Sequence, residues 1–553
     1  MYDPERVTTF AQADSRNRNV EFGIKAKDRT RHVYVIGKTG MGKSTLLENM
    51  AVQDIANGEG MAFIDPHGKT AELLLNYVPE HRLKDVLYFA PFDLEHPISF
   101  NVLEDVGFDK RHLVVSGLMS TFKKIWVDAW SARMEYILSN TLLALLETPG
   151  TTLLGVNRLL ADKDYRKKIV DNVKDPSVKS FWVDEFAKYT DRFAAEATPA
   201  IQNKIGQFTS NPLIRNIVGQ SKSSFDLRKM MDENKIIIIN LSKGRVGEAN
   251  ANLLGSMLIT KIYLAAMSRA DVSDKVLQKL PNFYLYVDEF QSFANESFAD
   301  ILSEARKYKL NLTIAHQYIE QMSEEVRAAV FGNVGTMITF RVGAFDAEVL
   351  EKEFAPQFTA EDLVNLGFAQ IYLKLMIDGV SSMPFSAVTM PPIKEPEKSY
   401  KQEVIEMSRL QFSINRASVE QDVLDWHKDG GQVPKKVEKK EEKIVEIKKE
   451  IVSDKIETRP KYTRRESPVI TPPLEEVIDD FVPLKELKAK SNVVNSANGV
   501  NNGKKVVSEK SLSELRAVLQ SLNKNKDKPK GEIPTENKIK EIPENELKKM
   551  LEI

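Results

Sequence analysis

Short apolar runs, many of them rich in β-branched residues, recur in two stretches of the chain, before residue 104 and after residue 230. These runs predict strands. They are RHVYVIG (31–37), MAFID (61–65), DVLYFAP (85–91), KIIIIN (235–240), FYLYVDEF (283–290), NLTIAHQ (311–317), GTMITFRV (335–342) and AQIYLKLM (369–376). A segment between the first two runs, residues 44–58, carries apolar residues at helical spacing. Strands that alternate with helices in this way predict a mostly parallel sheet within an α/β fold.

The stretch between these two sets of strands has a different pattern. Residues 105–230 contain few strand signals, and residues 133–148 place apolar side chains on one side of a helix that Pro149 and Gly150 end. We therefore expect an all-α subdomain inserted into the sheet domain.

The composition changes again near residue 430. Residues 434–450 are almost all charged, and residues 492–505 have low complexity. Such segments bury too little apolar surface to offset the entropy of ordering, so the sequence predicts a mostly disordered tail. Short helices are expected within it, for example where Ser511 and Glu514 form a capping box.

Charge and cysteine content narrow the classes of function. The 553 residues include 78 basic and 79 acidic side chains, giving a net charge of −1, so any nucleic-acid surface must be local. The absence of cysteine excludes disulfide frameworks, thiolate zinc sites and cysteine nucleophiles.

A membrane location is not expected from the hydrophobic pattern. Residues 1–30 do not resemble a signal peptide. The most apolar helical segment, 252–268, is shorter than the roughly 20 residues of a span and contains Lys261. We expect no transmembrane segment and a cytoplasmic location, with any membrane association mediated by partners.

The segment GKTGMGKST fulfils the pattern of a phosphate-binding P-loop, and it follows a predicted strand and opens a predicted helix. Backbone N–H groups at such a helix start cradle phosphates, the lysine reaches the β- and γ-phosphates, and the serine supplies an oxygen to Mg²⁺. The predicted nucleotide-binding residues are Gly37, Lys38, Thr39, Gly40, Met41, Gly42, Lys43, Ser44 and Thr45. We expect ATP and Mg²⁺ as cofactors, because no guanine-specificity motif N-K-x-D occurs.

The run FYLYVDEF supplies the expected partner of the P-loop. Asp288 at the end of this strand is predicted to hold Mg²⁺, and Glu289 to act as the base that polarises the attacking water. Gln317 ends a neighbouring strand, where it can sense the γ-phosphate or orient water, whereas His316 is expected to be structural.

Two arginines are candidates for a finger that stabilises charge in the transition state. Arg306 precedes the strand that ends in Gln317, and Arg341 follows another strand. From the residues alone, a solvated helix arginine explains Arg306 equally well. If Arg306 serves a neighbouring subunit, hydrolysis requires an oligomer.

These motifs together resemble the HerA/FtsK superfamily, and most of all its TraG/TraD-type coupling ATPases of type IV secretion and conjugation. The resemblance covers about residues 20–392 and is carried by GKTGMGKST, IDPHG (64–68), NLSKG (240–244), YVDEFQSF (286–293), EARKY (304–308) and AHQ (315–317). It implies a RecA-like fold and the roles given above for Lys43, Ser44, Asp288 and Glu289. It also implies that Gln317 is the motif glutamine and Arg306 the trans-acting finger.

The expected domains follow from the patterns of strands, helices and composition along the chain. They are residues 1–104 (first part of the ATPase domain), 105–230 (helical insertion), 231–395 (second part of the ATPase domain), 396–430 (helical extension) and 431–553 (mostly disordered charged tail). The sequence departs from the family in having no transmembrane helices, and in having only residues 1–30 ahead of the first predicted strand, which is too few for the N-terminal β-barrel of HerA-type enzymes.

The resemblance implies a hexameric ring that threads DNA through its pore, and Lys69, Lys243 and Arg245 are candidate pore contacts. The alternative is a motor for protein export or pilus assembly, because the same catalytic motifs serve both. A third possibility is a regulatory ATPase with little mechanical output. The tail is a candidate docking segment for secretion-system or relaxase partners.

Overall fold

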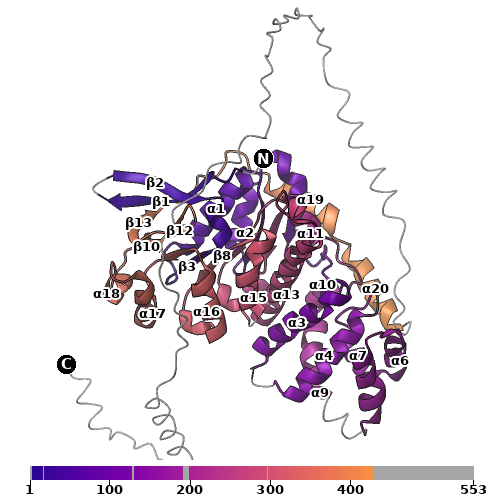
Figure 1. The fold of residues 1–553 in the computed structure, drawn as a ribbon. Helices are drawn as coiled ribbons and strands as arrows, with labels where there is room; N and C mark the ends of the chain where they lie inside the picture. Colours follow the sequence, from indigo (N-terminus) through magenta and orange to yellow (C-terminus); the bar gives the residue numbers. More distant parts are fainter. Residues whose placement is uncertain (1–2, 16–17, 128–129, 191–197, 296, 429–553) are drawn as a thin grey trace, which may run out of the picture. The chain divides into compact units, whose positions relative to one another are not determined.

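A computed structural model of the chain describes residues 3–15, 18–127, 130–190, 198–295 and 297–428 (Figure 1). Eleven strands form one sheet in the order β2–β1–β13–β10–β9–β3–β8–β7–β4–β6–β5. Their bounds are β1 Val7–Ser15, β2 Arg18–Lys25, β3 Val33–Ile36, β4 Gly60–Asp65, β5 Val86–Phe89, β6 Ile236–Asn240, β7 Phe283–Val287, β8 Leu310–His316, β9 Thr336–Thr339, β10 Gln370–Lys374 and β13 Phe385–Thr389. A separate hairpin pairs β11 (Met376–Ile377) with β12 (Val380–Ser381).

The sheet is parallel from β9 to β5 and antiparallel from β2 to β9. All eight predicted strands are present, which confirms an α/β fold with a mostly parallel sheet. The expectation that residues 31–37 form the first strand is wrong, because the antiparallel hairpin β1–β2 precedes them. This hairpin was missed because its residues alternate with polar side chains and form no continuous apolar run.

Each central strand presents alternate side chains to two separate apolar cores, as the pleat of a strand requires. In β6, Ile236 and Ile238 belong to the core beneath α1 (Lys43–Ala56) and α2 (Lys69–Leu74). Ile237 and Ile239 belong to the core on the other face. That face is covered by α13 (Glu248–Met267), α15 (Ser297–Glu304) and α16 (Glu324–Asn333). The sheet is therefore covered on both faces, which explains its nearly continuous apolar runs.

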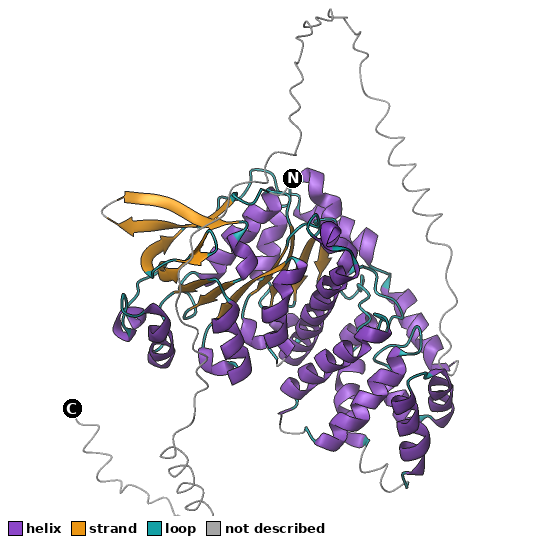
Figure 2. Cartoon of the chain, in the orientation of Figure 1, coloured by secondary structure: helices purple, strands orange, loops and turns teal. Residues whose placement is uncertain are grey.

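A region built of helices alone lies beside the sheet (Figure 2). Its helices are α3 (Arg111–Ile125), α4 (Ala132–Leu146), α5 (Gly155–Ala161), α6 (Lys163–Asn172), α7 (Pro176–Ser180), α9 (Pro199–Thr209), α10 (Pro212–Val218) and α11 (Leu227–Asp232). The described residues between β5 and β6 contain no strand. The helical region joins the sheet domain mainly where α3 packs on α13, with Gly117 against Thr260.

Helix α13 contains the most apolar segment of the sequence. It is part of one helical stretch, Glu248–Asp271, that is long and apolar enough to cross a membrane, and 67% of the most apolar part of that stretch is buried inside the protein. The helix packs against α3 and contributes many side chains to the larger core. Its apolar composition therefore matches that of a core helix.

The remaining helices lie at the edges of the sheet and after it. They are α12 (Lys243–Val246), α14 (Asp274–Leu277), α17 (Ala344–Phe354), α18 (Ala360–Val364), α19 (Lys401–Phe412) and α20 (Arg416–Lys428). Helix α19 covers the edge strand β5, where Ser408 Oγ accepts a hydrogen bond from Tyr88 N (2.9 Å). Helix α20 reaches the helical region, where Arg158 Nη1 donates to the carbonyl of Trp426 (2.8 Å). The predicted tail, including Ser511, lies outside the described residues, and the domain boundaries stay predictions.

Candidate nucleotide site

The P-loop connects β3 to α1, as its sequence predicts. Gly40 (φ 78°) and Gly42 (φ 115°) adopt left-handed backbone conformations that side chains disfavour, so the loop depends on glycine at both positions. Lys43 is buried, and its Nζ donates to the carbonyl oxygens of Gly37 (2.6 Å) and Lys38 (3.1 Å). The ammonium group is therefore folded over the loop, where a phosphate would meet it.

Asp288 is far from the P-loop in the sequence but contacts the first turn of α1. It follows β7, which is separated from the P-loop strand β3 only by β8, and its Oδ2 accepts a hydrogen bond from Ser44 Oγ (3.0 Å). Burial and the neighbouring charge of Glu289 raise the pKa of Asp288 to about 6.

The oxygens of Ser44 and Asp288 form a donor set that suits Mg²⁺, which is commonly bound by few protein oxygens together with phosphates and water. Within the described ranges, no group of three or more His, Cys, Asp or Glu side chains could hold a metal by itself. The site thus fits a metal that arrives with a nucleotide.

Glu289 is fixed by an unusual backbone conformation and by amide donors. Its φ of 49° turns the chain sharply at the end of β7, and its carboxylate accepts hydrogen bonds from the side chains of Gln291 and Gln317. Although burial raises the pKa of Glu289, contacts with His67, Gln291 and Gln317 outweigh that effect and hold the pKa at about 2. The carboxylate of Glu289 is therefore ionised at neutral pH.

Gln317 links Glu289 to the P-loop. It follows β8 directly, and its Oε1 accepts a hydrogen bond from Thr39 Oγ1 (3.0 Å) while its Nε2 donates to Glu289. Its neighbour His316 is buried and faces Tyr34 OH (3.2 Å). Burial lowers the pKa of His316 to about 3, in keeping with a structural role.

The segment IDPHG contains a histidine, His67, whose position the sequence does not predict. Asp65 accepts hydrogen bonds from the backbone amides of His67 (2.8 Å) and Ala71 (2.9 Å), and so fixes the turn between β4 and α2. The turn brings His67 Nε2 to 3.9 Å from Glu289 Oε1. The sequence does not predict that His67 lies near Glu289, because the two residues are far apart in the chain.

The two candidate arginines lie at opposite edges of the sheet. Arg341 follows β9, and its carbonyl accepts a hydrogen bond from Lys38 N (2.8 Å), so it adjoins the P-loop of its own chain. Arg306 is exposed in a 3₁₀ turn, Ala305–Tyr308, before β8, and thus lies at the amino edge of the sheet, away from its own P-loop. The structure therefore does not bring Arg306 together with the other predicted residues within one chain.

Two of the three candidate pore residues, Lys243 and Arg245, contact neighbouring side chains. Lys243 Nζ donates to Ser292 Oγ (2.9 Å), and the Arg245 guanidinium lies 3.5 Å from the centre of the Phe92 ring. Lys69, at the start of α2, is exposed.

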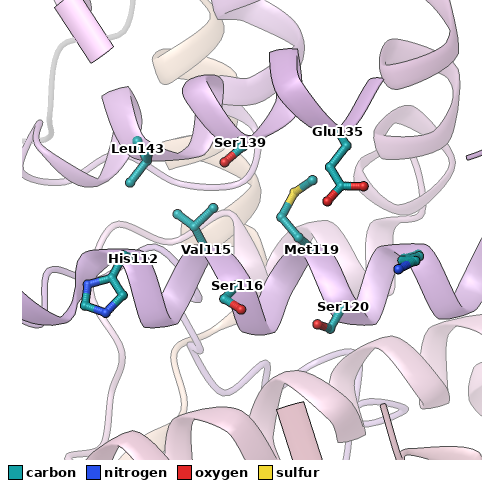
Figure 3. Close-up of a pocket in the computed structure, with 9 residues that line it drawn as sticks. His112, Val115, Ser116, Met119, Ser120, Glu135, Ser139 and Leu143 are labelled. Carbon is teal, nitrogen blue, oxygen red and sulfur yellow. The ribbon is translucent and has the colours of Figure 1, made fainter. Parts of the chain in front are cut away.

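A hollow of about 300 Å³ lies elsewhere, between α3 and α4 (Figure 3). His112, Ser116 and Glu135 are among the side chains that line it. None of the predicted nucleotide-binding residues belongs to it.

Comparison with known proteins places the chain in a family. The sequence profile described as type IV secretory system conjugative DNA transfer matches residues 3–335, which is more than half of the 553 residues. The chain belongs to this family.

Solved structures similar to this chain include the plasmid coupling protein TrwB. TrwB in complex with ADP and Mg²⁺ has a TM-score of 0.51 at 15% identity, covering 69% of this chain and 89% of that one. TrwB with the GTP analogue GDPNP also has a TM-score of 0.51, at 14% identity, with 72% and 98% covered. TrwB with the ATP analogue ADPNP has a TM-score of 0.50 at 14% identity and the same coverage. At such identities the similarity establishes the RecA-like fold alone. No curated protein sequence matches the chain.

Proposed function

We propose that this protein of the conjugative DNA transfer family is an ATP-hydrolysing ring motor that translocates DNA. The observation that carries this proposal is the convergence of Lys43, Ser44, Asp288 and Glu289 from two distant segments at one edge of the sheet. The structures of TrwB with ADP and Mg²⁺, with GDPNP and with ADPNP support nucleotide binding.

Each residue has a distinct role in this proposal. Lys43 would leave its two carbonyl partners to contact the β- and γ-phosphates. Ser44 and Asp288 would hold Mg²⁺, which would neutralise phosphate charge. Glu289, ionised at neutral pH, accepts the proton of the attacking water. Gln317 is placed to orient this water because it joins Glu289 to the P-loop.

Phe368 is a candidate contact for the nucleobase. The carboxylates lie on the β7–β8 side of β3, so a triphosphate with its γ-end there extends its base toward β9 and β10. Phe368, with 74% of its surface exposed, precedes β10, and the next residue, Ala369, donates from its N–H to the carbonyl of Met41 in the P-loop (3.2 Å). An exposed aromatic ring beside the loop offers a face for stacking.

Arg306 is proposed to act on the nucleotide of a neighbouring subunit in a hexamer. It shares a hollow at the amino edge of the sheet with Arg31 and Lys309. This surface is cationic and faces away from the P-loop of its own chain, so it can meet phosphates only across a subunit interface.

The decisive test measures ATP hydrolysis by the full chain with and without single- and double-stranded DNA. We expect hydrolysis to rise with DNA, and DNA affinity to fall steeply as salt increases, because phosphate contacts release counterions. Hydrolysis that DNA leaves unchanged would favour a protein-export motor. We further propose a cytoplasmic location, with the C-terminal tail recruiting secretion partners.

A further inference from the structure

The loop that follows the base Glu289 is held by side chains from three other elements. Within residues 291–295, Lys124 Nζ of α3 donates to the carbonyls of Gln291 (2.5 Å) and Ala294. The remaining contacts are Lys243 Nζ to Ser292 Oγ (2.9 Å), Ser256 Oγ to the carbonyl of Phe293 (3.2 Å), and Asn295 Nδ2 to Thr121 Oγ1 (3.3 Å). Every residue of this loop, here called the clamped loop, therefore has an external contact.

Lys124 makes the strongest of these contacts. It is the only one of these side chains that bonds two carbonyls of the clamped loop, and charge-assisted hydrogen bonds are roughly twice as strong as neutral ones. Among the described residues, no carboxylate forms an ion pair with it, and the charged side chain that influences its pKa is another cation, Lys243. Burial, together with the charge of Lys243, lowers the pKa of Lys124 to about 8.

A lysine with no acidic partner is costly to bury unless its hydrogen bonds compensate. The two carbonyls of the clamped loop provide that compensation. These hydrogen bonds to the clamped loop therefore explain how a lysine can be buried at position 124.

Gln291 connects Lys124 to Glu289, the proposed base. The backbone carbonyl of Gln291 accepts from Lys124, while its side-chain amide donates to the Glu289 carboxylate. A backbone hydrogen bond also joins the clamped loop to Glu289, because Ser292 N donates to the carbonyl of Glu289 (2.8 Å). A shift of the Gln291 backbone would therefore move a donor that holds the carboxylate in place.

We propose that Lys124 is a positioning residue that fixes Gln291 and, through it, the Glu289 carboxylate, so that movement of α3 in the helical region changes the efficiency of hydrolysis. The inference rests on the proposed ATPase activity. It assigns the helical region a direct mechanical connection to the catalytic base.

The first test compares ATPase kinetics of four full-length variants: Lys124→Met, Lys123→Met, Gln291→Ala, and Lys124→Met combined with Gln291→Ala. We expect Lys124→Met to lower kcat about tenfold with KM for ATP changed less than twofold, because the residue orients the base without touching nucleotide. Lys123 is the matched control, since it is exposed and lines the hollow between α3 and α4.

The double variant separates positioning from general destabilisation. If Lys124 acts through Gln291, the double variant turns over ATP no more slowly than Gln291→Ala alone. A kcat for Lys124→Met equal to that of wild type, or losses that multiply in the double variant, would overturn the proposal. An inactive wild-type protein would instead count against the proposed function.

A second readout does not require turnover. The backbone amides of Ser292, Phe293 and Ala294 donate to the carbonyls of Glu289 and Phe290, just before the clamped loop. Their hydrogen–deuterium exchange should accelerate in Lys124→Met and remain at the wild-type rate in Lys123→Met. Equal protection in all three proteins would overturn the proposal whether or not the protein hydrolyses ATP.

Discussion

At the scale of single residues, the adjacent carboxyl groups of Asp288 and Glu289 have opposite environments. Asp288 is buried, accepts hydrogen bonds from the Ser44 hydroxyl and the Glu289 backbone amide, and has a raised pKa, whereas the carboxylate of Glu289 accepts from side-chain donors and has a pKa of about 2. The first arrangement suits a carboxylate that gains its counter-charge with the metal. The second suits a base that is ready before the nucleotide arrives.

Replacing the base without changing its shape should separate binding from hydrolysis. We expect Glu289→Gln to reduce ATP turnover at least about a hundredfold while nucleotide affinity stays near that of wild type, because the amide cannot accept the water's proton. Turnover assays and titration with a fluorescent nucleotide would check this. Turnover at the wild-type rate would show that another group is the base.

The sequence predicted those site residues whose roles depend on local context. The P-loop, Asp288 and Glu289 each follow an apolar strand, so their convergence at one edge could be anticipated. His67, Gln291 and Lys124 could not be found in this way, because their roles arise from contacts between segments far apart in the chain.

At the scale of elements, one buried ion pair connects the P-loop helix to the strand of Asp288. Arg29 donates to both carboxylate oxygens of Asp54 in α1 (2.6 and 2.8 Å) and to Tyr286 OH in β7 (2.7 Å). Arg29 and Asp54 are almost completely buried. This network fixes the distance between the two elements that form the site.

Removing one partner of this pair should leave an uncompensated buried charge. We expect Arg29→Met to lower the free energy of unfolding by about 3–5 kcal/mol, and the double variant Arg29→Met/Asp54→Leu to recover part of that loss. Urea denaturation of the nucleotide-free proteins would measure both. A double variant as unstable as Arg29→Met would contradict the ion-pair explanation.

His32 makes the junction of β3 with β8 sensitive to acid. It is fully buried, its Nδ1 accepts from Leu312 N (3.1 Å), and burial lowers its pKa to about 4. An unfolded histidine titrates near 6.5, so the unfolded state binds more protons between these two values, and stability falls as the pH drops through that window.

From pH 7 to pH 4.5, we expect His32 to contribute a loss of roughly 2 kcal/mol. Denaturation at several pH values across this range should show a smaller decrease in the free energy of unfolding for His32→Gln than for wild type. Parallel pH profiles for the two proteins would argue against this origin.

The elements missed from the sequence share one physical property. Strands β1, β2 and β13 lie in the antiparallel part of the sheet, where one face is less covered, so that buried residues alternate with more exposed ones. The parallel strands are buried on both faces and produce unmistakable apolar runs. Detection from the sequence therefore largely followed burial, with β10 as an exception: it was predicted although its residues alternate between buried and less buried positions.

At the scale of the whole molecule, the position of Arg306 requires a second subunit for its proposed role. We expect Lys43→Ala and Arg306→Ala proteins each to be nearly inactive alone, and their mixture to regain measurable ATP hydrolysis. In the mixture, some interfaces would join the intact P-loop of an Arg306→Ala subunit to the intact Arg306 of a neighbouring Lys43→Ala subunit. Turnover measured against mixing ratio would check this, and a mixture as inactive as its components would exclude action between subunits.

The place of β13 in the sheet has a consequence for biosynthesis. This strand inserts between β1 and β10, so the amino-terminal hairpin finds its partner only after residues 385–389 have left the ribosome. Until then, the nascent chain carries an unpaired strand edge of the kind that invites aggregation. Chaperone protection during synthesis would matter most for this stretch, and premature stop codons before β13 would leave the same edge permanently open.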